Sequence, residues 1–102
     1  MTDLKITTIQ THLVWEDVDA NITHFNSRLN ALKEQTDVVV LPEMFTTGFS
    51  MNPAKVAEPH FGSETLAWMQ QWANQLSIAI TGSLAIQEDG KYFNRLYFVQ
   101  PH

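Results

Sequence analysis

The sequence predicts an α/β fold in which strands alternate with two amphipathic helices. Three observations support it: a wholly apolar run at residues 38–41, two segments with helical spacing of apolar residues, and an Asp-Gly pair between two strand-like segments near the C-terminus. The expected order of elements is β-α-β-α-β-β. Such alternation favours a parallel first pair of strands joined by a right-handed crossover.

The first strand and first helix are expected in the N-terminal third. Residues 4–9 alternate as a strand does. Apolar residues then recur every three or four positions, on one stripe of a helix, at Val18, Ile22, Phe25, Leu29 and Leu32. Asp17 is the expected N-cap, because its carboxylate can accept an N–H of the first turn. The opposite face, which we expect in solvent, carries Asn21, Arg28, Asn30 and Lys33.

The middle of the chain combines a short strand, a long loop and a second helix. The β-branched run at 38–41 suits a strand covered on both faces, and Pro42 ends it because proline cannot donate to a ladder. Residues 43–60 are expected to form a long loop with room for a helical turn. Ser63 is the expected cap of a helix that faces the core through Leu66, Met69, Ala73 and Leu76.

The last third is expected to be a β-hairpin. Asp89-Gly90 is a strong turn signal, because both central positions of a two-residue hairpin loop require a positive φ. Such a loop places Ile86 opposite Phe93. The sequence ends soon after this apolar strand, and apolar edges are usually covered or charged. We therefore expect these residues to be part of a longer chain.

Composition excludes several classes of protein. The 102 residues allow one domain or part of one, and six scattered basic residues within a net charge of −5 argue against nucleic-acid binding. The longest apolar run is far shorter than the ~20 residues of a membrane-spanning helix. The first ten residues lack the apolar run of a secretory signal, so a cytoplasmic protein is expected. The absence of cysteine excludes a cysteine nucleophile within these residues.

Glu43 is the residue whose position points most directly to chemistry. It directly follows the second strand and Pro42, and open α/β sheets bind ligands beyond the carboxyl ends of their strands. Apolar neighbours would destabilise the charged carboxylate and raise its pKa toward that of a general base. Alternatively, the Pro-Glu pair begins a short helix, with the acid near the positive end of the helix dipole.

Other polar residues give weaker signals. The histidines lack the spacing typical of a metal site, and the isolated glycines form no phosphate-binding loop. Asn94 and Arg95 can orient a substrate, but the polar face of a half-exposed strand explains them equally well. Neither a metal nor a nucleotide is therefore expected.

Several segments in order resemble the carbon–nitrogen hydrolase (nitrilase) superfamily. The opening strand Leu4–Gln10, the stretch from Trp15 to Asn21 and the strand Asp37–Glu43 are similar to that family's first strand, first helix and glutamate-bearing strand. The stretch Met44–Phe49 and the hairpin residues Gly82-Ser83 and Asp89–Leu96 resemble its bacterial omega-amidase branch. The resemblance covers essentially the whole chain.

This resemblance implies a four-layer α-β-β-α sandwich, of which residues 1–102 form the N-terminal part of a single domain. It implies a homodimer without metal or organic cofactor and a Glu-Lys-Cys triad acting on small carboxamides, typically 2-oxo acid amides. Glu43 matches the glutamate, whereas Lys55 and Lys91 do not match the lysine. The lysine and cysteine are expected beyond His102. Phe45 and Phe49 are candidate substrate contacts, with core packing as the alternative for each.

Three functions remain possible at this point. The favoured one is an amidase whose nucleophile lies outside these 102 residues. The others are a catalytically inactive binding or regulatory module and an unrelated α/β ligand-binding domain, for instance a flavodoxin-like one. The 102 residues alone are expected to show no amidase turnover and poor solubility.

Overall fold

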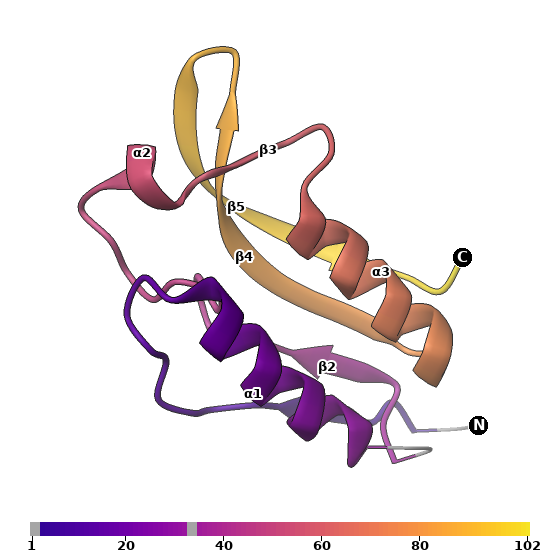
Figure 1. Ribbon diagram of the computed structural model, residues 1–102. Helices are drawn as coiled ribbons and strands as arrows, with labels where there is room; N and C mark the ends of the chain where they lie inside the picture. Colours follow the sequence, from indigo (N-terminus) through magenta and orange to yellow (C-terminus); the bar gives the residue numbers. More distant parts are fainter. Residues whose placement is uncertain (1–2, 33–34) are drawn as a thin grey trace.

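The computed structural model describes residues 3–32 and 35–102. Within these ranges the elements are β1 (Ile6–Thr8), α1 (Val18–Asn30), β2 (Val38–Val40), α2 (Pro53–Val56), β3 (Glu58–Pro59), α3 (Glu64–Leu76), β4 (Ala79–Glu88) and β5 (Lys91–Val99). The predicted order is confirmed, and the predicted loop contains the expected helical turn, α2, together with a two-residue strand, β3, that was not predicted (Figure 1).

The five strands form one mixed sheet built around β4. β1 pairs with β2 and β2 with β4, both in parallel, while β5 runs antiparallel along β4 from Ile80 to Glu88. Because β5 occupies one edge of β4, β2 and β3 share the other, at residues 79–81 and 86–87 respectively. Residues 82–85 of β4 lie between these two pairings, next to the chain segment that leaves β2.

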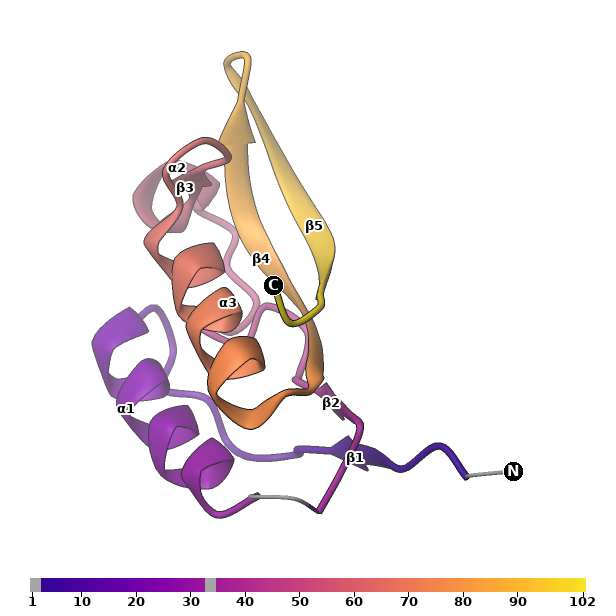
Figure 2. The same ribbon diagram turned by 90° about the vertical axis from the view of Figure 1, so that its right-hand side faces the viewer.

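Both long helices lie on the same side of the sheet (Figure 2). Their buried stripes, which include Phe25, Leu29 and Met69, pack with Val39 and Ile80 of the sheet in one core. The predicted caps are confirmed: Asp17 Oδ1 accepts the N–H of Ala20 at 3.0 Å, and Ser63 Oγ accepts that of Leu66 at 3.1 Å. The expected pairing of Ile86 with Phe93 is also present.

One residue of the predicted solvent face of α1 is instead buried. Asn21 is 2% exposed, and its amide exchanges two hydrogen bonds of 2.8 Å with the backbone of Val14 and donates to the Thr46 carbonyl at 2.7 Å. Arg28 and Asn30 are exposed as predicted, and Lys33 lies outside the described residues. The prediction for Asn21 was wrong because helical spacing cannot reveal that two loops close over this position.

The sheet face directed away from the helices carries exposed apolar side chains. Ile6, Leu96 and Phe98 are 58%, 70% and 57% exposed. The described residues thus form two layers, one of helices and one of strands (Figure 2). In the described part of the chain, no helix has the length and hydrophobicity that crossing a membrane requires.

Candidate active site

The segment that leaves β2 follows the edge of β4 and carries Glu43. The N–H of Leu41 donates to the Thr81 carbonyl at 2.8 Å, and that of Met44 donates to Ser83 Oγ, also at 2.8 Å. Met44 has a φ of +47°, and its carbonyl accepts the N–H of Gly48 at 2.8 Å. Residues 43–47 therefore form turns, so the alternative in which Pro42-Glu43 begins a short helix is wrong.

Phe45 anchors this turn in the core beneath the sheet. Its ring is fully buried and meets Phe25 edge-on, with 5.5 Å between ring centroids. A Cβ atom at Gly82 would lie 3.0 Å from two carbons of the Phe45 ring and 3.1 Å from Leu41 Cβ. The absence of a side chain at position 82 thus allows Leu41 and Phe45, which flank Glu43 in the sequence, to pack tightly against β4.

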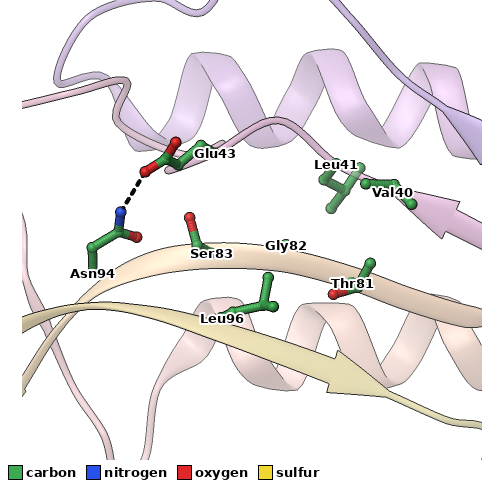
Figure 3. A pocket seen from close by; sticks show the side chains of 8 residues that line it. All are labelled: Val40, Leu41, Glu43, Thr81, Gly82, Ser83, Asn94 and Leu96. Carbon is green, nitrogen blue, oxygen red and sulfur yellow. Dashed lines mark hydrogen bonds between the residues drawn. The ribbon is translucent and has the colours of Figure 1, made fainter.

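A cavity of about 330 Å³ lies at the carboxyl end of β2. Its lining is drawn from β2, the following turn and the β4–β5 hairpin, and consists of Val40, Leu41, Glu43, Thr81, Gly82, Ser83, Asn94 and Leu96 (Figure 3). Thr81, Ser83, Asn94 and Leu96 share one face of the hairpin, because Ser83 is in register with Leu96 and Ala85 with Asn94. This is the strand-end location at which open α/β sheets bind ligands.

Glu43 contributes the one ionisable side chain of this lining. Its Oε1 accepts a hydrogen bond of 2.6 Å from Nδ2 of Asn94, 51 residues away in the sequence (Figure 3). The residue is exposed, so the predicted desolvation by apolar neighbours is wrong for this chain. The site therefore presents a solvated carboxylate held by a neutral amide, with the Ser83 hydroxyl close by.

The other candidate residues do not meet in this cavity. Phe45 is buried in the core, and Phe49 is 72% exposed with its carbonyl accepting the indole N–H of Trp15 at 2.8 Å. Arg95 forms an ion pair of 2.8 Å with Glu88, whose carboxylate raises the pKa of the guanidinium above its ordinary value. Neither phenylalanine nor Arg95 lines the cavity.

Ser83 and Thr81 line the cavity but were not recognised as site residues from the sequence. Strand parity places both on the small-residue face of their strand, opposite Ile80 and Leu84. The sequence did not show which face of the sheet the Glu43 side chain lies over. Over residues 3–32 and 35–102, His, Asp and Glu side chains form no group of three or more that could hold a metal ion.

The arrangement can accept a proton at Glu43 and hydrogen-bond a small polar ligand. The chain matches the family model of the carbon–nitrogen hydrolases over residues 5–102. Omega-amidase YafV of Yersinia enterocolitica is 44% identical over 101 residues, and YafV of Escherichia coli K12 is 42% identical over 101 residues. Each match covers 99% of this chain but 38% of the relative.

Solved structures resemble this chain over the same part of their length. XC1258 from Xanthomonas campestris, a CN-hydrolase superfamily protein, matches with a TM-score of 0.91 at 36% identity, covering 99% of this chain and 38% of that one. Nit3 of Saccharomyces cerevisiae, from the nitrilase superfamily, matches with a TM-score of 0.82 at 25% identity, covering 95% of this chain and 40% of that one. The chain thus spans less than half the length of these relatives.

Proposed function

Because the chain belongs to the carbon–nitrogen hydrolase family, we propose that it is the N-terminal part of an amidase in which Glu43 is the general base. The observation that carries this proposal is the position of Glu43, in a cavity at the carboxyl end of β2 and in the turn that directly follows this strand. Family membership contradicts the alternative of an unrelated, flavodoxin-like domain.

The proposed reaction is covalent acyl transfer to a cysteine from the rest of the polypeptide. Glu43 takes the thiol proton, and the thiolate attacks the amide carbonyl to form a tetrahedral intermediate. A lysine, also from outside this chain, stabilises the oxyanion, a contribution of ~3–4 kcal/mol for one well-placed donor. The C–N bond breaks as the amine takes the proton from Glu43 and leaves as ammonia. A thioester remains on the cysteine.

Glu43 then acts as the general base a second time, in the hydrolysis of the thioester. It takes a proton from water while the water oxygen attacks the thioester, and the proton returns to the departing thiolate. The products are a carboxylic acid and the free thiol. In this proposal the cavity contributes the base, Glu43, which is the ionisable side chain of its lining.

We further propose a 2-oxo acid with a terminal amide, such as 2-oxoglutaramate, as the substrate. Support comes from the 44% and 42% identity to proteins called omega-amidases and from the omega-amidase-like segments around Glu43 and in the hairpin. Phe45 and Phe49 enter this proposal as weaker candidates for substrate contact, since neither lines the cavity of this chain. Homodimerisation and a cytoplasmic location remain predictions.

The test is a comparison of ammonia release from 2-oxoglutaramate by the complete polypeptide and its Glu43→Gln variant. Glutamine keeps the shape but cannot accept the thiol proton, so kcat should fall about 10²–10⁴-fold. Glu64→Gln, at an exposed site in the first turn of α3, is the matched control and should keep full activity. Near-normal kcat in Glu43→Gln would refute the base assignment, and an inactive complete polypeptide would favour the binding or regulatory module.

A further inference from the structure

We propose that Asn94 is a positioning residue that holds the Glu43 carboxylate in the direction needed for proton transfer. The inference rests on the proposed function of Glu43 as the base. Its geometric foundation is the 2.6 Å hydrogen bond from Asn94 Nδ2 to Glu43 Oε1, drawn across the cavity in Figure 3. Asn94 acts through Glu43 and makes no contact with the reacting atoms in this proposal.

Asn94 lies on a strand that is paired along its length. Its strand β5 is in register with β4 along the whole stretch from Ile80 to Glu88, and Asn94 lies directly opposite Ala85. Both side chains are exposed, but Glu43 belongs to a turn and not to a paired strand. An exposed glutamate without a partner would sample several rotamers, whereas a donor fixed on a strand selects one of them.

The chemistry of the donor suits a partner of a general base. A carboxylate has two oxygens that both accept, so the bond at Oε1 leaves Oε2 available for the thiol proton. The amide of Asn94 has no charge, so it orients the carboxylate without the strong electrostatic stabilisation of the ionised form that a lysine or arginine would add. It cannot take up the proton itself.

The same hairpin also holds the backbone next to Glu43. Ser83 Oγ accepts the N–H of Met44, whose φ of +47° lies in the left-handed region that a side-chain-bearing residue seldom adopts. Ser83 and Asn94 lie on the same face of the hairpin. One rigid unit therefore determines both the path of the turn and the direction of the carboxylate.

The test uses the complete polypeptide with Asn94→Ala, Asn94→Asp and a matched control. We expect Asn94→Ala to lower kcat about 10–100-fold, because small misplacements of a reacting group have effects of this size, while KM changes less than about threefold. The isosteric Asn94→Asp should lower kcat more than Asn94→Ala does, since it places a second carboxylate where the amide donor was. Asn26→Ala removes an asparagine that accepts from Trp68 and Trp72 at 2.7 and 2.9 Å; it should lower Tm but leave kcat unchanged.

A double-mutant cycle separates positioning from a merely structural role. In the Glu43→Gln background, Asn94→Ala should cause no further loss of kcat, because the group through which Asn94 acts is already disabled. Wild-type kcat in Asn94→Ala, or an additional loss in the double variant equal to the loss in wild type, would overturn the proposal. Either result would leave the role of Glu43 itself intact.

A crystal structure of the Asn94→Ala variant provides a readout that does not depend on activity. We expect the Glu43 side chain to turn away from its direction in the parent protein or to occupy several conformers. An unchanged, single Glu43 conformer would overturn the positioning role. If instead Glu43→Gln retains full activity, the proposed function fails, and this structural comparison still decides whether Asn94 directs Glu43.

Discussion

The backbone N–H of Met44 donates to the hydroxyl of Ser83 at 2.8 Å, although the two residues are 39 positions apart. Met44 is 7% exposed and has a positive φ, so its N–H has little access to water and its backbone conformation needs support from its surroundings. The contact joins the turn that carries Glu43 to the central strand of the sheet. It links the stability of the fold to the geometry of the site.

Replacing Ser83 by alanine should therefore destabilise the protein. The Met44 N–H would be left in a buried position without its acceptor, which costs about 1–3 kcal/mol in the free energy of unfolding. Denaturant titration of the complete polypeptide followed by tryptophan fluorescence measures the change. Ser27→Ala, on the exposed face of α1, is the control; equal effects of the two variants would contradict the importance of this contact.

Gly82→Ala should also destabilise the protein, through overpacking. The new Cβ would lie 3.0 Å from the Phe45 ring and 3.1 Å from Leu41 Cβ, and forced repacking of this kind costs about 1–3 kcal/mol. Because a leucine at position 45 is smaller, the double variant Gly82→Ala/Phe45→Leu should lose less stability than the sum of the two single variants. Simple additivity in thermal or chemical unfolding would show that the ring is not the obstacle.

Asn21→Ala should be among the more damaging substitutions in α1. It removes three hydrogen bonds to the backbone of Val14 and Thr46, and the buried Thr46 carbonyl loses this donor. We expect a loss of about 2–4 kcal/mol in the free energy of unfolding, since buried polar groups without partners are costly. Asn30→Ala at the exposed end of the same helix should change stability by less than about 0.5 kcal/mol. Similar losses in both variants would be inconsistent with the structure.

Glu16 should make the stability of the protein dependent on pH in the acid range. Its carboxylate accepts from Lys55 Nζ at 2.8 Å and from Ser50 Oγ at 2.6 Å, and these two hydrogen bonds lower the pKa of Glu16 below its ordinary value of 4.5. A carboxyl with a lower pKa in the folded state stabilises the protein fully above 4.5. This contribution is lost as the pH falls through the folded-state pKa.

The comparison of wild type with Glu16→Gln measures this effect. The wild type should be more stable at pH 7, and the difference in unfolding midpoint should shrink as the pH is lowered below 4.5. Lys55→Ala removes the larger cause of the shift, so its stability should vary less with pH in this range than that of the wild type. A difference between wild type and Glu16→Gln that stays constant from pH 7 to pH 3 would refute the prediction.

The elements that were predicted correctly depend on local signals. The caps Asp17 and Ser63 act on N–H groups three residues away, and the Asp89-Gly90 turn sets the register that places Ile86 opposite Phe93. The short strand β3 was not predicted, because two residues carry no periodicity and their pairing with Ile86 and Gln87 is formed only in the folded chain.

The candidate site, too, was predicted from the sequence in part and decided by the tertiary structure in part. Glu43 was identified because its position after a buried strand has a direct meaning in α/β sheets. The tertiary structure decided that Glu43 is exposed and that Asn94 is its hydrogen-bond partner. The alternation of side chains along a strand assigns each residue to one face, but it does not tell which distant side chain lies over that face. For Asn94 the two interpretations, a substrate-orienting residue and a solvated strand position, were equally consistent with the sequence.

The sequence by itself thus determined the order of the main elements, the helix caps and the hairpin register, since each of these follows from interactions over a few positions. It also pointed to Glu43 as the candidate base, whose role stays a prediction. The tertiary structure alone decided that Asn21 is buried, that Ser83 supports Met44 and that Asn94 binds Glu43. These contacts join residues 25, 39 and 51 positions apart, and they form only when folding brings a turn of the chain against a helix or a strand distant in the sequence.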